Sequence, residues 1–445
     1  MQSFAHNAIA AYLRAKPHDR RDLKMPAESR NADSGVTLGA HGLFVILAAT
    51  ALALLSTPLA APAMPEIAKV FAENAQNEPF ARAILSAISI LPGEPSVIFL
   101  VKFILLSIPA LFIILGAPVV GWLSDNIGRK SLLNVSLLIF GIAGTSGYFA
   151  DSFFFMFVGR AILGLSIAGI KTATVAMVGD YYEGAERNRV IGWQGSAMKF
   201  GGVIFMLLGG FLANFSWQAP FLGYMLAFVI LPSGLIALSQ RLPVARATAS
   251  LEDSSLPAIP LGSASYVFIS AFLASALFFI TPVQLPFYLR NAFNATPFEM
   301  GAAIALGNTI GALTSLTYHR FKNRLNFVGI YAVIYLSMAL GYLVVASASS
   351  YAMALLGMII AGTGFGLYVP NQSSWILSIV SQKRRGFGVG IVTTAMFLGQ
   401  FSAPILVQPF IDPTNPAAVW TAVSYTLFGL AVVYVFLSRF SSRHA

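Results

Sequence analysis

Apolar stretches of about 20 residues, separated by short polar segments, recur about twelve times along the chain. A stretch of this length crosses a hydrocarbon core of about 30 Å as an α-helix, whereas a barrel strand would show two-residue alternation. The pattern therefore predicts an all-α integral membrane protein with twelve transmembrane helices. The expected spans are 41–64, 97–121, 131–150, 153–177, 189–213, 217–238, 264–288, 298–318, 327–347, 351–376, 387–409 and 418–438.

The composition supports this interpretation. Hydrophobic residues make up 57% of the chain, charged residues 10%, and the mean hydropathy is +0.76, whereas soluble domains are about a quarter charged. The absence of cysteine excludes disulfides, thiol catalysis and cysteine-bound metals, and the five histidines lie in tails or near helix ends. No cofactor and no metal is expected.

Positive charge is distributed unevenly about the expected spans. With the amino terminus inside, 20 Lys and Arg fall in the tails and inner loops, and outside there are only Lys69, Arg82 and Arg290. Since the inner loops of membrane proteins carry the excess of basic residues, both termini are expected in the cytoplasm and the protein in the cell (inner) membrane. This distribution explains the net charge of +10 without a nucleic-acid partner.

Two longer polar segments divide the chain. Residues 65–96 form an expected outer loop in which 81–91 has the pattern of an amphipathic interfacial helix. A Pro-, Ser- and Ala-rich stretch near the middle is expected to be a linker. We predict a cytoplasmic tail, a six-helix bundle, a cytoplasmic linker, a second six-helix bundle and a short cytoplasmic tail, at 1–38, 39–239, 240–262, 263–438 and 439–445.

A weak internal repeat agrees with the division into two pseudo-symmetric bundles. Gly159 and Gly164 recur 198 residues further on as Gly357 and Gly362. The same shift relates two further pairs, Arg187 to Arg385 and Gly192 to Gly390.

Four cations fall inside the expected spans: Lys102, Arg160, Lys171 and Lys199. A charge in lipid near the bilayer centre costs about 2.5–3.5 kcal/mol on insertion scales, so these side chains should face the bundle interior or reach the interface. Lys102 lies near the outer end of its span, where we expect it to extend outward to the interface. The alternative role of each cation is to bind backbone carbonyls at a helix break.

Arg160 and Lys171 are eleven residues apart, which places them within about 20° of one direction and about 16 Å apart along a helix. Gly164 and Ile167 lie between them and leave room for a ligand or a close helix. We therefore predict that Arg160, Lys171 and Lys199 bind substrate.

Prolines interrupt two expected helices beside polar residues. Two prolines flank Gln284, and Pro370 precedes Asn371 and Gln372. Proline frees carbonyls, which is tolerated in a membrane where the backbone lines a cavity or is paired by a neighbour. Gln284, Asn371 and Gln372 are predicted to bind solute, with hydrogen bonds between helices as the alternative.

Acidic residues are absent from the middle of the expected spans. All 17 Asp and Glu lie in tails, loops or helix ends, and only Glu66, Asp151 and Asp180 are close enough to helices to exchange protons with them. The lack of a nucleophile or base within the membrane excludes an enzyme. A cavity with cations and no carboxylate should favour anionic, zwitterionic or neutral solutes over lipophilic cations.

Residues Gly121 to Lys130, read as G-W-L-S-D-N-I-G-R-K, join the second and third expected spans. This stretch resembles the loop G-x-x-x-D-x-x-G-R-[KR] between the second and third helices of the major facilitator superfamily. The fixed positions are Gly121, Asp125, Gly128, Arg129 and Lys130. The resemblance implies two six-helix halves that expose a site near the midplane alternately to the two sides of the membrane.

The same resemblance implies an inner gate. Asp125 would approach the amino end of a helix near 386–388, where the helix dipole favours a carboxylate. Arg129 would pair with Asp180. Both contacts would join surfaces that separate when the inner gate opens, and the second half keeps the cations of the corresponding loop, 318–324, without the carboxylate.

Further stretches are similar to proton-coupled drug exporters of this family. In Phe157 to Gly169, Arg160 matches an arginine implicated in coupling, and the P-A-M-P-E-I sequence ending at Ile67 is also similar. One departure is in the fifth span, where Phe205 and Met206 replace the central Gly-Pro of the antiporter pattern.

These features predict a transporter of small organic solutes that works as a monomer in the lipid bilayer by alternating access. Efflux coupled to protons is expected, with Arg160, Glu66 and Asp180 as coupling residues. Uptake or uniport of an organic anion is the alternative suggested by the cations and the altered antiporter pattern. A non-transporting membrane receptor is a further alternative.

Overall fold

The computed structural model of the chain describes residues 38–53, 58–75, 77–88, 96–182, 184–237, 261–380, 385–412 and 414–441. All but residue 38 of the expected amino-terminal tail, all but residues 261 and 262 of the expected linker, and most of the carboxyl-terminal tail lie outside these ranges. Every element in the described ranges is a helix. The first half of the chain contains α2 (Ala40–Leu52), η3 (Ala61–Ala63), α3 (Met64–Ala75), α4 (Pro79–Ile88), α5 (Val97–Lys102), η4 (Phe103–Ser107), α6 (Ile108–Ile127), α7 (Arg129–Thr145), η5 (Ser146–Phe149), α8 (Phe153–Tyr181), α9 (Gly184–Ala213), α10 (Ala219–Leu222), η6 (Gly223–Met225) and α11 (Leu226–Ala237).

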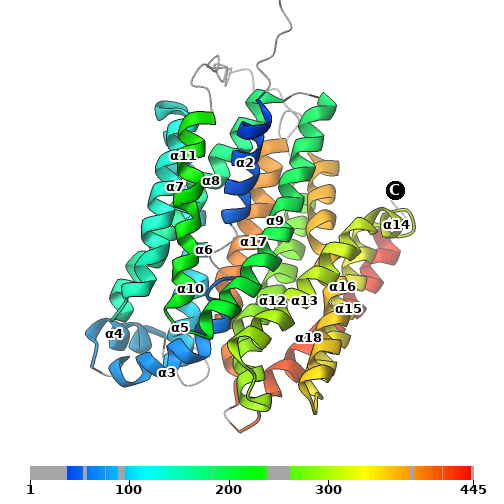
Figure 1. The fold of residues 1–445 in the computed structure, drawn as a ribbon. Helices are drawn as coiled ribbons and strands as arrows, with labels where there is room; N and C mark the ends of the chain where they lie inside the picture. Colours follow the sequence, from blue (N-terminus) through cyan, green and yellow to red (C-terminus); the bar gives the residue numbers. More distant parts are fainter. Residues whose placement is uncertain are drawn as a thin grey trace, which may run out of the picture. The chain divides into compact units, whose positions relative to one another are not determined.

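The second half contains α12 (Leu261–Phe293), α13 (Pro297–Leu316), α14 (Tyr318–Lys322), α15 (Phe327–Ala346), α16 (Tyr351–Ile379), α17 (Arg385–Val407), η9 (Gln408–Phe410) and α18 (Ala418–Ser441). Figure 1 shows α7, α8 and α11 on one side, α15, α16 and α18 on the other, and α9, α12, α13 and α17 between them. We call the end that carries α3 and α4 the α4 end, and the end that carries α14 the α14 end.

Within the described ranges, ten helices are long and apolar enough to cross a membrane. Of the other two expected spans, the first contains the shorter apolar helix α2, and the eighth corresponds to α13. Glu299, Asn308 and several glycines lower the apolar character of α13, which has 20 residues. The fold is therefore the predicted all-α membrane fold.

The first expected span, 41–64, is wrong as a continuous helix. α2 ends at Leu52, a turn follows at 58–60, and a single 3-10 turn leads into α3. Pro58 lies in the turn and Pro62 in η3. Proline lacks the amide hydrogen that a continuous helix requires, which explains why no single α-helix runs through these residues.

The expected loop at 121–130 is also shorter than predicted. α6 continues to Ile127, and Gly128 is the single residue between α6 and α7. Gly128 has φ +82° and ψ 149°, a conformation that is accessible almost only to glycine. This glycine therefore permits the reversal between two antiparallel helices.

The internal repeat is present in the structure. α8 and α16 each have 29 residues, and their first and last residues are 198 positions apart. Their amino ends are capped alike, since the Ser152 hydroxyl accepts a hydrogen bond from the Phe155 amide and the Ser350 hydroxyl accepts one from the Met353 amide. Such caps satisfy an amide that the first helical turn leaves unpaired.

Matched glycines also contact matched helices. α8 packs against α6 and α7, and α16 packs against α13 and α15. A Cβ atom at Gly164 would lie 2.5 Å from the Pro109 carbonyl oxygen of α6, and one at Gly362 would lie 2.6 Å from the Gly307 carbonyl oxygen of α13. Small residues allow this close approach of membrane helices. The two halves therefore share one packing scheme.

Candidate functional site

A cavity of about 280 Å³ lies between the two halves. The first half contributes α8, α9 and residues near the end of α2, and the second half contributes α12, α13, α16 and α17. The lining residues are Ala53, Pro58, Lys171, Gly195, Met198, Lys199, Gly202, Met206, Phe278, Phe279, Thr281, Pro282, Ile304, Asn308, Gly311, Ala312, Phe365, Tyr368, Val369, Met396, Phe397 and Gln400. None of them is acidic.

Equivalent positions of the two halves face this cavity. Four pairs of lining residues are 198 positions apart: Lys171 and Val369, Met198 and Met396, Lys199 and Phe397, Gly202 and Gln400. They lie on α8 with α16 and on α9 with α17. The repeat therefore relates the two walls of the site, although the chemistry of the paired residues differs.

The two lysines of the cavity both contact the opposite half. The Lys171 ammonium lies 4.4 Å from the centroid of the Phe397 ring. The Lys199 ammonium donates a hydrogen bond to the hydroxyl of Ser315 in α13. Neither lysine forms an ion pair within the described residues. Both positive charges are therefore placed where an anion inside the cavity could reach them.

Aromatic side chains of α12 and α16, in the second half, also line the cavity. The Phe278 ring centroid lies 4.9 Å from that of Phe365 and 5.3 Å from that of Tyr368. Phe279 lies beside Phe278, with 5.1 Å between their centroids. Such a cluster offers flat apolar surfaces and edges to an aromatic or aliphatic solute. The cavity is thus cationic toward the first half and aromatic toward the second.

Asn308, Gln400 and Phe397 line the cavity although sequence reasoning did not select them. Asn308 is an amide within the apolar helix α13, and this polarity was the signal that could have identified it. Gln400 is 4% exposed, and its amide donates to the Leu106 carbonyl across the two halves at 3.2 Å. Phe397 could have been found from Lys199 through the 198-residue shift.

Arg160 does not lie on the cavity, which corrects its predicted common substrate face with Lys171. Its guanidinium is fully buried, and it donates to the Tyr224 hydroxyl at 3.0 Å and to the Gly144 carbonyl at 3.2 Å. Its guanidinium carbon lies 4.9 Å from the centroid of the Phe221 ring. All these partners belong to the first half. Along the length of α8, one face meets neighbouring helices at Arg160 and the cavity at Lys171.

Lys102 does not extend outward as expected. The residue is 3% exposed, and its ammonium donates to the Gln284 side-chain carbonyl of α12 at 2.5 Å. The ammonium also lies 4.4 Å from the centroid of the Phe287 ring. A partner in the opposite half therefore satisfies the charge, and Gln284 is placed against Lys102 and not on the cavity.

Asn371 and Gln372 also lie off the cavity. Asn371 is fully buried and donates to the Phe327 carbonyl at 3.0 Å, and Tyr318 donates to its side-chain oxygen at 3.2 Å. These bonds join α16 to α15 and α14, as in the alternative role considered for this residue. Gln372 is fully buried, and neither polar atom of its amide has a hydrogen-bond partner within the described residues.

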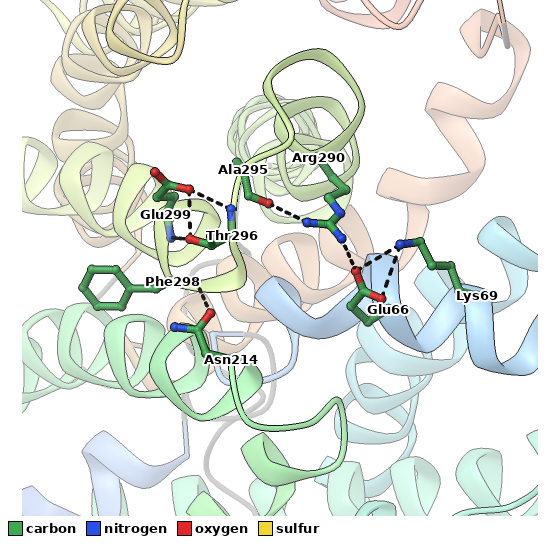
Figure 2. A network of polar contacts seen from close by, with 8 residues as sticks. All are labelled: Glu66, Lys69, Asn214, Arg290, Ala295, Thr296, Phe298 and Glu299. Carbon is green, nitrogen blue, oxygen red and sulfur yellow. Dashed lines mark hydrogen bonds and ion pairs between the residues drawn. The ribbon is translucent and has the colours of Figure 1, made fainter.

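The α4 end is closed by contacts between the halves. The Arg290 guanidinium of α12 lies 2.9 Å from the Glu66 carboxylate of α3, and Lys69 lies 3.2 Å from the same carboxylate. Figure 2 shows this cluster beside the turn at 295–299, where the Phe298 amide donates to Asn214 at 3.4 Å. Deeper in the bundle, Ser107 donates to the Phe401 carbonyl at 2.7 Å. The cavity is therefore separated from the α4 end by bonds that must break if this end opens.

The α3–α4 segment is also attached to the first half. The Glu78 carboxylate accepts hydrogen bonds from the amides of Phe153 and Phe154, each at 2.8 Å, at the amino end of α8. The Phe71 ring lies 4.9 Å from that of Phe153. A carboxylate at a helix amino end is favoured by both the free amides and the helix dipole. This segment therefore spans from α8 to Arg290.

At the α14 end, Arg129 and Asp180 form the ion pair that the family resemblance implies. The pair joins α7 to α8, which pack against each other within the first half. It therefore does not connect the two halves, and the expectation that it joins separating surfaces is wrong. The structure does not describe the side chain of Asp125 or the packing around Gly386, so their contact stays a prediction. Gly121 lies within α6, and Lys130 is half-buried in the first turn of α7.

The repeated helices, the cavity between the halves and the closed α4 end define a membrane carrier with a solute site between two bundles. The sequence model of the Major Facilitator Superfamily matches residues 39–404. The chain belongs to this superfamily. It is therefore a membrane transporter of small molecules and, as the sequence predicted, not an enzyme.

Relatives and solved structures are consistent with this assignment. Quinolone resistance protein NorA of Staphylococcus aureus is 23% identical over 332 residues, 72% of this chain and 83% of that protein. Multidrug resistance protein 1 of Bacillus subtilis is 24% identical over 300 residues, 65% and 75% of the two chains. The structure of the human organic anion transporter MFSD10 (TETRAN) has a TM-score of 0.62 at 20% sequence identity, and the match covers 89% of this chain and 98% of that one. The structure of a D-xylose–proton symporter has a TM-score of 0.68 at 15% sequence identity, and the match covers 88% of this chain and 96% of that one. These structural similarities show the fold.

Proposed function

We propose that this protein exports small amphipathic organic compounds by alternating access, with a preference for anionic over cationic ones. The observation that carries this proposal is the cavity itself, which has two lysines, an aromatic wall and no acidic lining residue. At an effective dielectric constant of 20, two unit charges 4 Å apart interact by about 4 kcal/mol. A lysine of the cavity therefore attracts an anionic ligand and repels a cationic one. Zwitterionic and neutral compounds are also accommodated, because most of the wall is apolar.

Export is supported by the relatives, whose names refer to resistance to quinolones and to several drugs. The uneven distribution of basic residues supports an orientation in which the α14 end and both termini lie on the cytoplasmic side of the inner membrane. In this orientation the described contacts close the outer end.

Coupling to protons is the finer part of the proposal, and Glu66 is its carrier. Among the coupling candidates, Arg160 and Asp180 have their partners within the first half, whereas Glu66 pairs with Arg290 of the second half. A proton on the Glu66 carboxylate removes this attraction between the halves.

The test is transport into proteoliposomes with three matched probes. They are anilinonaphthalene sulfonate as anion, phenylnaphthylamine as its uncharged relative, and tetraphenylphosphonium as cation. The wild type should accumulate the anion and the neutral dye when a pH gradient is imposed, and Lys171→Val should reduce anion uptake about tenfold, a loss of about 1.4 kcal/mol. Neutral dye uptake should change little, and Arg82→Val, which replaces an exposed cation outside the cavity, serves as control.

Each outcome separates the alternatives. Unchanged anion uptake in Lys171→Val would contradict the charge preference. Equilibration of the anion without any effect of the gradient would favour a uniporter or importer of organic anions, which the absence of a carboxylate from the cavity makes the second candidate. A wild type that moves no compound of the panel would favour a non-transporting receptor.

A further inference from the structure

Both cavity lysines belong to the first half and contact residues of the second half. Residues that only attract substrate would not need such contacts. Lys171 of the first half lies against Phe397 of the second, and Lys199 of the first half bonds to Ser315 of the second. Two contacts between the halves therefore cross the cavity. Both contacts use the ammonium groups that an anionic substrate would bind.

The Lys171–Phe397 contact is the more easily replaced of the two. A cation over a ring contributes about 0.5–2 kcal/mol, depending on its exposure to water. A hydrogen bond between an ammonium and an anion is roughly twice as strong as one between neutral groups, because both partners are charged. An anion that enters the cavity therefore competes successfully for the Lys171 ammonium and leaves the ring without its cation.

The position of Phe397 gives an independent reason to assign it a role. Phe397 is the counterpart of Lys199 in the repeat, and both residues line the cavity. Where the first half has its second cation, the second half has the ring that contacts the first cation. The ring is thus placed by the repeat at the point where the two walls meet.

We propose that Phe397 is a placeholder ligand, which holds Lys171 across the halves until an anionic substrate replaces it. In the empty carrier this bond adds to the contacts that keep the α4 end closed. In the loaded carrier Lys171 binds the anion, the bond to Phe397 is released, and opening at the α4 end becomes easier. This inference rests on the proposed preference for anions and adds the step by which binding favours export over movement of the empty carrier.

The test uses the absence of native cysteine, which allows a single reporter to be introduced. Ala63 is fully buried in η3, which contacts α12 and α13 of the second half. Ala63→Cys should therefore react with a hydrophilic maleimide only when the α4 end opens. The labelling rate is measured in nanodiscs with and without anilinonaphthalene sulfonate, whose binding is followed by fluorescence.

Phe397→Leu should bind the dye roughly two- to fivefold more tightly, because the competing contact is lost. Its reporter should also be labelled roughly two- to fivefold faster without dye, and the dye should accelerate labelling less than in the wild type. Phe278→Leu removes a cavity ring whose described ring contacts are all to residues of the second half; it is the matched control and should not increase labelling. In Lys171→Met the dye should not accelerate labelling.

Weaker dye binding by Phe397→Leu together with unchanged labelling would overturn the inference, since Phe397 would then be only part of the wall. Equal acceleration of labelling in Phe278→Leu and Phe397→Leu would also overturn it, because loosening of the wall would suffice. A wild type that binds phenylnaphthylamine but not the sulfonate would instead contradict the proposed function. The two failures are thus distinguished by the wild type alone.

Discussion

α8 and α9 of the first half and α16 and α17 of the second have the same frame and different chemistry. α8 and α16 agree in length, in capping serine and in the helices that they contact. Yet Lys171 corresponds to Val369, Lys199 to Phe397, and Arg160 to Met358. The first half has a cation at each of these positions, and the second half has an apolar side chain. The comparison teaches that the packing of small residues sets the frame, while the charge of the site is set by single side chains.

The largest effect should come from giving the second half the buried arginine of the first. Met358 is fully buried, and the residues 198 positions after Tyr224 and Phe221 are Ala422 and Val419, which offer neither a hydroxyl nor a ring. Met358→Arg should therefore destabilise the protein by about 3–5 kcal/mol, as expected for an unpaired buried charge. Thermal unfolding in detergent measures this.

The reverse change sharpens the same comparison. Arg160→Met removes the charge and leaves the Tyr224 hydroxyl and the Gly144 carbonyl without this donor, at a cost of about 1–3 kcal/mol. It should be tolerated better than Met358→Arg. Equal stability of both variants would mean that the two halves do not differ in their ability to hold a cation.

The next effect should be equal in the two halves. Gly164→Ala and Gly362→Ala place a methyl group 2.5 Å and 2.6 Å from a backbone oxygen of the neighbouring helix. Each should cost about 1–3 kcal/mol through overpacking. Gly121→Ala, where no heavy atom lies within 4 Å of the added methyl group, is the control and should be nearly neutral. A marked difference between the first two variants would break the equivalence of the frames.

The smallest effect should come from the ion pair between the halves. The side chains of Glu66 and Arg290 are 31% and 27% exposed, so Glu66→Gln should change the balance between closed and open α4 ends by under about 1 kcal/mol. Labelling of Ala63→Cys should rise up to about fivefold. Glu78→Gln is the matched control at the same end, because its backbone partners lie in the same half. A larger response of Glu78→Gln would assign the closure to the α3–α4 segment as a whole.

The sequence predicted the fold because long apolar stretches have few alternatives in a membrane. The predicted ends of two spans were wrong, because single residues decide where a helix ends. Prolines near α2 interrupt the first span, and α6 continues through most of the expected loop to Gly128. A hydrophobic pattern records that a segment is apolar, and it does not record where the backbone turns. Length and hydropathy therefore gave the number of spans more reliably than their ends.

The site was only partly predictable for a different reason. Lys171 and Lys199 were selected as intramembrane cations, and both line the cavity. Lys102 and Arg160 were selected on the same ground and have partners elsewhere, because which helix faces a given turn depends on tertiary packing. Phe397 was missed because an aromatic residue in an apolar helix carries no signal until its repeat partner is considered.

The constant shift of 198 residues also records the history of the chain. It relates the helix caps Gly128 and Asn326 and the cavity residues Gly202 and Gln400. It also relates both ends of α8 to both ends of α16. If the halves arose by duplication of one segment, neither copy has since gained or lost a net residue over this stretch. One inserted residue would turn the following helix by about 100° and carry its cavity face into lipid. Divergence between the copies has therefore proceeded by exchange of side chains on a backbone whose count of residues was fixed.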